Sequence, residues 1–177
     1  MDYLWAPWRF AYFEDPFPVE GCLFCWAPRQ EDSPTNLVVY RGEHAYAMLN
    51  RYPYTSAHLM IVPYRHTDTL VTLEDPVLLE LMHLTQQAIQ VLQDLYKPQG
   101  FNVGFNIGRA AGAGIVEHIH LHVVPRWTGD TNFMTTLAQA RVLPEALDVT
   151  FEKVRTAWQR RFPPSQKRSS SPSASAG

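Results

Sequence analysis

Histidines occupy positions 118, 120 and 122, separated by single aliphatic residues. Alternation with a period of two is typical of a β-strand, so the three imidazoles are expected on one face of that strand and the aliphatic side chains on the other. Successive histidines would then lie roughly 6.6 Å apart along the backbone, close enough to converge on one phosphate or one metal ion. Because imidazole titrates near neutral pH, this row indicates chemistry rather than a merely solvated strand, which would normally carry Thr, Ser or Lys.

Two cysteines form a second group of reactive residues. Cys22 and Cys25 are separated by two residues, a spacing compatible with a redox pair, with half of a metal site or with chance. Two further ligands would decide between these interpretations. The sequence supplies two candidates, namely His66, which follows a predicted strand end, and His118, the first histidine of the row.

A glycine-rich segment at residues 108–114 leads directly into the histidine row. Glycine lets a backbone approach a ligand closely and adopt positive φ. The N–H groups of this segment are therefore expected to cradle a phosphate, with Gly112 and Gly114 as candidate binding residues. A plain flexible turn is the alternative interpretation.

The elements that position these groups follow from hydrophobic periodicity and turn residues. Strands are predicted at residues 37–40, 45–49, 58–62, 101–106 and 118–124. A long helix is expected to begin with Asp75 as N-cap and Pro76 as the first helical residue, and to end before Pro98. Its predicted buried positions are Val77, Leu81, Leu84, Ala88, Val91 and Leu95, with Met82 also in the helix core and His83 at the surface. A last helix is expected at about residues 144–162.

Strands in succession, with one long helix inserted and no repeated βαβ unit, predict an α+β antiparallel sheet. Residues 1–20 are rich in aromatic residues and broken by proline, which favours an ordered arm laid over the domain or a partner subunit. Residues 21–140 are expected to form the catalytic domain, followed by the C-terminal helix at 141–162. Residues 163–177 are a Ser/Pro/Ala tail that cannot build a core and is expected to be disordered.

Composition narrows the class of protein. A chain of 177 residues with 46% hydrophobic residues can bury the core of one compact domain. A formal charge of -2 and a pI near 6.4 argue against nucleic acid or an anionic membrane as partner, so phosphate binding must be local. The sequence has no run of 18 apolar residues and no basic segment ahead of an apolar one at its start, so we expect a cytoplasmic protein.

The segment His118-Ile119-His120-Leu121-His122-Val123-Val124 resembles the His-φ-His-φ-His-φ-φ motif of the histidine triad (HIT) superfamily of nucleotide hydrolases and transferases. The similarity covers about residues 1–140. It also includes Cys22-x-x-Cys25, Asn50-Arg51-Tyr52-Pro53, His58-Leu59-Met60-Ile61-Val62-Pro63, Pro125-Arg126-Trp127 and Gly129-Asp130-Thr131-Asn132-Phe133-Met134. These flanking segments resemble the diadenosine tetraphosphate phosphorylase-like branch more than the short nucleoside phosphoramidase branch. The resemblance implies a five-stranded HIT sheet with the long helix packed on one face, usually as a dimer.

The resemblance also implies that the triad of His118, His120 and His122 is the catalytic group. The central His120 would attack the α-phosphorus and carry the nucleotidyl group as a covalent phosphoramidate. Neutral imidazole is a good nucleophile at pH 7, and a covalent intermediate divides one difficult displacement into two easier ones. A hydrogen bond from the other ring nitrogen of His120 to a carbonyl would keep the attacking nitrogen unprotonated. His122 would donate a hydrogen bond to phosphate oxygens or to the leaving oxygen. For His120, the alternative interpretation is a histidine of the core whose ring is hydrogen-bonded and has no catalytic role.

Other binding residues come from the same comparison. Asn50 and Asn106 lie where HIT proteins commonly contact ribose and phosphate, although Asn50 could equally be an ordinary turn residue. Arg126, like Arg109, is a candidate contact for distal phosphates or the incoming acceptor, with a solvated surface charge as the alternative. Many relatives place Gln and then Ser or Thr just before the triad. This chain has Gly114 and Ile115 there, in a loop one residue longer, so backbone donors would have to replace a hydroxyl.

The resemblance to zinc-bearing HIT proteins implies a metal site made of Cys22, Cys25, His66 and His118. Two thiolates and two imidazoles are typical of a closed, tetrahedral, structural Zn²⁺ site. Such a site would tie the N-terminal arm to the catalytic strand and leave His120 available for chemistry. Reduced free thiols are the alternative, and a disulfide is disfavoured in a cytoplasmic protein. No organic cofactor is expected.

The reaction implied is cleavage of a diadenosine polyphosphate, most readily the tetraphosphate, through nucleotidyl-His120 and transfer to phosphate or water. Phosphate as acceptor gives ATP and ADP, and the segment Trp5-x-Pro7-Trp8-Arg9 together with the residues after the triad favours this phosphorylase. The alternatives are an asymmetric dinucleoside polyphosphate hydrolase, a nucleoside phosphoramidate hydrolase and a nucleotide-binding regulator without turnover. An unbroken triad argues against the regulator, because binding alone does not need a central nucleophile.

Overall fold

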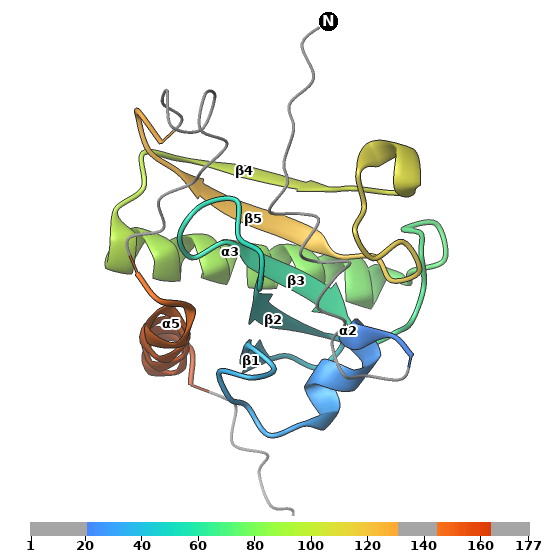
Figure 1. Cartoon of the computed structure of the whole chain (residues 1–177). Helices are drawn as coiled ribbons and strands as arrows, with labels where there is room; N and C mark the ends of the chain where they lie inside the picture. The colour runs from blue at the N-terminus through green and yellow to red at the C-terminus, as the bar shows by residue number, and fades with distance from the viewer. Residues whose placement is uncertain (1–20, 131–144, 164–177) are drawn as a thin grey trace, which may run out of the picture.

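The computed structural model describes residues 21–130 and 145–163 (Figure 1). The predicted N-terminal arm and nearly all of the predicted tail lie outside these ranges, as does the segment at 131–144. Five strands form one antiparallel sheet in the order β1-β2-β3-β5-β4. They are β1 (Val38–Arg41), β2 (Ala45–Leu49), β3 (Leu59–Pro63), β4 (Gly100–Phe105) and β5 (Leu121–Arg126). The predicted α+β fold is confirmed.

The long helix α3 (Asp75–Tyr96) covers one face of the sheet, behind the strands in Figure 1. Helix α5 (Leu147–Arg161) packs against α3 and β1, and its buried Trp158 stacks on Tyr40 with ring centroids 5.3 Å apart. The short helix α2 (Leu23–Trp26) and the 3₁₀ turn η2 (Ala27–Arg29) precede β1. The opposite face of the sheet is therefore left for the functional residues.

Helix α3 differs in detail from the prediction. Its N-cap is Glu74 rather than Asp75, because the amides of Val77 and Leu78 both bond to the Glu74 carbonyl. Leu92 occupies the buried face in place of Leu95, which is 36% exposed. The prediction of core positions was also wrong for Met82, which is 51% exposed because it lies on the side of the helix away from the sheet, beside the exposed His83.

Strand β5 begins at Leu121, three residues later than predicted. Pairing with β3 starts only at Leu121, and the Ile119 amide bonds instead to the Thr67 carbonyl, 2.7 Å away. The alternation of side chains nevertheless continues through this irregular start, since Ile119 joins the hydrophobic core while the rings of His118 and His120 both contact Phe24. Helix α5 likewise begins at Leu147, after Ala146 as N-cap, a few residues later than expected.

One row of residues crosses the sheet on the face away from α3. Met48 of β2 is paired with Met60 of β3, Met60 with His122 of β5, and His122 with Gly104 of β4. This register sets two methionines on one side of His122 and a glycine on the other. No helix among the described residues is long and apolar enough to span a bilayer.

Candidate active site and metal centre

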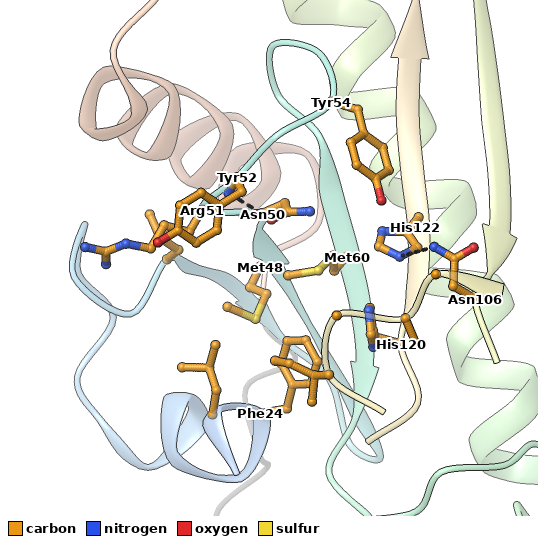
Figure 2. Close-up of a pocket in the computed structure, with 16 residues that line it drawn as sticks. Phe24, Met48, Asn50, Arg51, Tyr52, Tyr54, Met60, Asn106, His120 and His122 are labelled. Carbon is orange, nitrogen blue, oxygen red and sulfur yellow. Dashed lines mark hydrogen bonds between the residues drawn. The ribbon is translucent and has the colours of Figure 1, made fainter. Parts of the chain in front are cut away.

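A cavity of about 280 Å³ opens on the free face of the sheet (Figure 2). Its apolar part is formed by Leu23, Phe24, Leu37, Met48, Met60 and Ile115. Its polar part is formed by Asn50, Arg51, Tyr52, Tyr54, Asn106, His120 and His122, together with Gly112, Ala113 and Gly114 of the glycine-rich loop. An apolar slot that ends in a few polar groups is typical of a small-molecule site.

His120 is 5% exposed and directs one ring nitrogen away from the cavity. Its Nδ1–H donates to the carbonyl oxygen of His118 at 2.9 Å, which is the type of hydrogen bond predicted from the sequence. Nε2 is therefore the unprotonated nitrogen, with its lone pair available to the cavity. Burial lowers the pKa of His120, against opposing contributions from the His118 carbonyl and Glu117, so the ring is neutral at pH 7.

His122 lies beside it, with the two ring centroids 4.8 Å apart. Behind His122 is a fourth histidine, His58, which is completely buried and whose Nε2 lies 2.9 Å from Nδ1 of His122. The Tyr54 amide donates to Nδ1 of His58 at 3.2 Å, so His58 must carry its proton on Nε2 and donate it to His122. His122 in turn carries its own proton on Nε2, directed toward the cavity. Asn106 Nδ2 lies 3.5 Å from that nitrogen, which is long for a hydrogen bond.

Sequence reasoning placed His58 at the start of a strand but gave it no role. A signal was available, because a histidine directly before an apolar, fully buried strand is a polar residue in need of a partner. The partner, His122, is 64 residues away in the chain, and no local pattern connects the two.

The glycine-rich loop folds as a tight turn in front of the histidine row. Gly108 (φ 81°) and Gly112 (φ 85°) have positive φ at the two ends of η3 (Arg109–Ala111), and Gly112 is in the left-handed helical conformation. Gly112 and Gly114 both line the cavity. Among the described residues, no acceptor is paired with the backbone N–H of Gly114 or of Ile115, so both can donate to a ligand.

Of the other predicted binding residues, the two asparagines line the cavity and the two arginines do not. Asn50 and Asn106 both line the cavity, and Asn50 Oδ1 accepts the Tyr52 amide at 2.9 Å. Arg126 lies outside it, in an adjoining hollow, and forms a bidentate pair with Asp130 at 2.6 and 2.8 Å. This pair raises the pKa of Arg126 and neutralises its charge locally. Arg109 is exposed and lines neither hollow.

The four predicted metal ligands come together at one end of the histidine row. The ligand atoms of Cys22, Cys25, His66 and His118 all lie within 4.8 Å of one another. Nδ1 of His118 is 3.3 Å from Sγ of Cys22 and 3.6 Å from Sγ of Cys25. Nδ1 of His66 is 3.3 Å from Sγ of Cys25 and 3.3 Å from Nδ1 of His118.

These separations fit a tetrahedral zinc ion. Bonds of about 2.0–2.1 Å to nitrogen and 2.3 Å to sulfur place neighbouring ligand atoms roughly 3.3–3.8 Å apart in a tetrahedron. The Nε2–H of His118 donates to the Pro63 carbonyl at 2.9 Å, which orients the ring and leaves Nδ1 unprotonated for a metal. Burial lowers the pKa of His118 to about 4 and raises that of the Cys22 thiol to about 11. A half-buried thiol with a raised pKa, such as that of Cys22, needs a nearby cation to be deprotonated at neutral pH.

Phe24 connects the two centres. It is 1% exposed, lines the cavity, and its ring centroid lies 5.5 Å from that of His118 and 4.7 Å from that of His120. It is carried by α2, between the two cysteines, and the Cys25 and Trp26 amides both bond to the Cys22 carbonyl. The turn that presents the thiols therefore also positions one wall of the cavity.

Known proteins share this architecture. The HIT domain model matches residues 31–129. The AP-4-A phosphorylase of Mycobacterium tuberculosis is 43% identical over 166 residues, which cover 89% of this chain and 84% of that protein. A HIT-like protein of Methanocaldococcus jannaschii is 34% identical over 109 residues, covering 62% of this chain and 81% of that one.

A solved structure agrees with these sequence matches. The Zn-bound histidine triad family protein from Mycobacterium smegmatis superposes with a TM-score of 0.63 at 26% identity, covering 79% of this chain and 94% of that one. The family model covers more than half of the chain, and the histidine row lies within it. The chain therefore belongs to the HIT family.

Proposed function

We propose that this HIT enzyme cleaves diadenosine polyphosphates, with the tetraphosphate as main substrate and inorganic phosphate as acceptor, through a covalent nucleotidyl group on His120. The observation that carries this proposal is the pair of fixed ring tautomers. His120 presents a lone pair on Nε2, and His122, 4.8 Å away between ring centroids, presents an N–H to the same cavity. The name of the 43% identical relative, AP-4-A phosphorylase, supports the choice of substrate and acceptor.

In the first step, the Nε2 lone pair of His120 attacks the α-phosphorus. The bond from that phosphorus to its bridging oxygen breaks, and its electron pair departs with ATP while His122 donates its N–H to the leaving oxygen. In the second step, an oxygen of inorganic phosphate attacks the same phosphorus and gives its proton to Nε2 of His122, which restores that ring. The phosphorus–nitrogen bond breaks, its electron pair returns to Nε2 of His120, and ADP leaves.

The cavity offers a matching surface for the adenylyl half. The apolar part around Phe24, Met48 and Met60 is suited to an adenine ring, with aromatic and thioether contacts (Figure 2). Asn50, which lines the cavity, would contact the ribose, and the N–H groups of Gly114 and Ile115 would donate to the α-phosphate. These backbone donors take the place of the hydroxyl that this loop lacks.

We further propose that Cys22, Cys25, His66 and His118 hold a structural Zn²⁺. The ion would supply a closed, four-ligand crosslink without an open position for substrate. The chain's own residues would remain responsible for the reaction, with His118 orienting His120 through its carbonyl oxygen.

We also propose a cytoplasmic homodimer. β4 is the last strand of the sheet, and its outer edge pairs with no strand of the described residues. An open edge that carries Val103 at 43% exposure favours pairing with a second copy. Light scattering on the full chain should give twice 20.3 kDa, whereas a monomer mass at assay concentration contradicts this assembly. Cell fractionation tests the compartment.

The reaction is tested with diadenosine tetraphosphate, with and without inorganic phosphate. We expect ADP and ATP when phosphate is present, and label from an α-³²P-labelled dinucleotide on His120 in protein denatured at alkaline pH, where a phosphorus–nitrogen bond survives. His120→Asn should bind nucleotide and lose both label and turnover, while His83→Asn on the exposed face of α3 serves as the matched control. AMP and ATP as products with or without phosphate contradict phosphorolysis. A labelled His120→Asn protein contradicts the nucleophile.

A further inference from the structure

A second cavity of about 320 Å³ lies beside the first and shares Tyr54, Asn106 and His122 with it. It runs along β5 from His122 to Arg126, whereas His120 lines only the first cavity. Because His120 and Arg126 lie on opposite sides of His122 in the chain direction of the strand, the second cavity begins on the side of His122 that faces away from the nucleophile.

Gly104 keeps this second cavity open. It is paired with His122 across β4 and β5, and a Cβ atom added at Gly104 would meet no atom within 4 Å. Its φ lies outside the left-handed region that favours glycine, so a larger residue would be tolerated by the backbone. A side chain at this position would project into the space beside His122.

The second cavity has both polar and apolar walls, and its charged side chains, Arg126 and Asp130, are paired with each other. Asp130 neutralises Arg126 and also accepts the Trp127 amide at 3.1 Å. Nη1 of Arg126 donates to Oδ1 of Asn102 at 2.6 Å, which fixes the Asn102 amide and leaves its NH₂ group as a donor. Together with the Asn106 amide, this gives neutral hydrogen-bond donors on the far side of His122.

Phosphoryl transfer places the entering and leaving groups roughly in line through phosphorus. With His120 attacking from the first cavity, the leaving oxygen must depart past His122. We infer that the second cavity receives the departing polyphosphate and then holds the inorganic phosphate that attacks nucleotidyl-His120. This inference rests on the proposed function and specifies the acceptor site for it.

The acceptor must reach phosphorus from the side opposite the phosphorus–nitrogen bond, which is the place that the leaving group has vacated. An oxygen of the bound phosphate then forms the new bond to phosphorus, and the electron pair of the broken bond returns to His120. Water can use the same route without a binding site. Occupancy of the second cavity by phosphate therefore decides between ADP and AMP as product.

The inference is tested by placing a larger side chain in the second cavity. Gly104→Val should lower the ratio of ADP to AMP formed from diadenosine tetraphosphate at fixed phosphate by at least about tenfold, because the added branched side chain competes with phosphate for space. This product ratio is independent of the fraction of folded enzyme. Gly100→Val is the matched control, since Gly100 is on the same strand, also has no atom within 4 Å of an added Cβ, and lies outside both cavities.

A second variant probes the polar wall without changing its size. Asn102→Asp exchanges the amide donor for a carboxylate and should raise the KM for inorganic phosphate roughly tenfold. The phosphate anion loses a hydrogen-bond donor and meets a second negative charge. Wild-type product ratio and phosphate KM in both variants overturn the inference and leave the proposed function intact. If His120 of the wild-type protein never becomes labelled by the ³²P-dinucleotide, the proposed function is wrong and so is the inference that rests on it.

Discussion

Nε2 of His58 lies 2.9 Å from Nδ1 of His122, and this contact dictates which nitrogen of His122 faces the substrate. His58→Phe keeps an aromatic ring in the buried site but removes this donor. We expect kcat to fall by roughly 10²-fold or more, because His122 loses the partner that holds its proton on Nε2.

The loss in His58→Phe should depend on the leaving group. An amine leaving group, as in adenosine 5′-phosphoramidate, depends on protonation more than the ATP leaving group does. The kcat for adenosine 5′-phosphoramidate should therefore fall further than the kcat for diadenosine tetraphosphate. Thr85→Val, which alters a buried hydroxyl bonded to the Leu81 carbonyl within α3, is the control for a merely structural loss. Equal reductions for the two substrates would contradict the proton-donating role of His122.

Zinc removal is expected to destabilise the protein. Cys25→Ser and His66→Ala should each lower the zinc content of purified protein well below one ion per chain, measured by atomic emission. The melting temperature should also fall, because a four-ligand crosslink between α2, the segment after β3 and the start of the histidine row is lost. His44→Ala, a change of a histidine outside the cluster, should keep the ion. Equal zinc in all of these proteins would reject the site.

Phe24 is expected to contribute to both stability and binding. Phe24→Ala should cost about 3–5 kcal/mol in unfolding free energy, since a fully buried aromatic side chain is removed. The Kd for a non-hydrolysable adenine nucleotide should rise as well, because the same ring lines the apolar part of the cavity. Denaturant titration and calorimetry measure the two effects. As a control, Phe24→Leu should retain most of the stability of the wild-type protein. Unchanged nucleotide affinity in Phe24→Ala would show that Phe24 does not contact the nucleotide.

The turn between β1 and β2 depends on Glu80 of α3, whose carboxylate accepts the amides of Glu43, His44 and Ala45. Glu80→Ala should destabilise the fold by about 1–3 kcal/mol, because these partly buried donors lose their acceptor. Nucleotide binding at low temperature should persist, since the turn lies outside both cavities. A shift in urea midpoint with constant slope is the expected measurement.

The position of the Glu80 carboxylate also explains why residue 42 is a glycine. A Cβ atom there would lie 2.5 Å from Oε1 of Glu80 and 2.8 Å from the Ala45 carbonyl oxygen, so Gly42→Ala should cost about 1–3 kcal/mol through overpacking. Gly100→Ala, whose added Cβ meets open space, should change stability by less than about 0.5 kcal/mol. Equal stability of the two variants would show that the turn can relax.

The sequence alone determined the class of fold, the approximate positions of the strands and the long helix, and the shared face of the three histidines. These properties are local, because alternation and helical spacing are written within single segments, and three histidines two residues apart share a face wherever the strand lies. Likeness to a family also predicted the four candidate metal ligands, which the structure brings together, although the spacing of Cys22 and Cys25 alone left several interpretations open.

Only the tertiary structure decided which groups act together. The pairing of His58 with His122, the neutralisation of Arg126 by Asp130, and the placement of Gly104 beside His122 all depend on strand register and on contacts between elements. The late start of β5 at Leu121 has the same origin, since the Ile119 amide finds its acceptor at Thr67 rather than in the sheet. Such contacts join residues that are distant in the chain, so periodicity and local propensity contain no information about them.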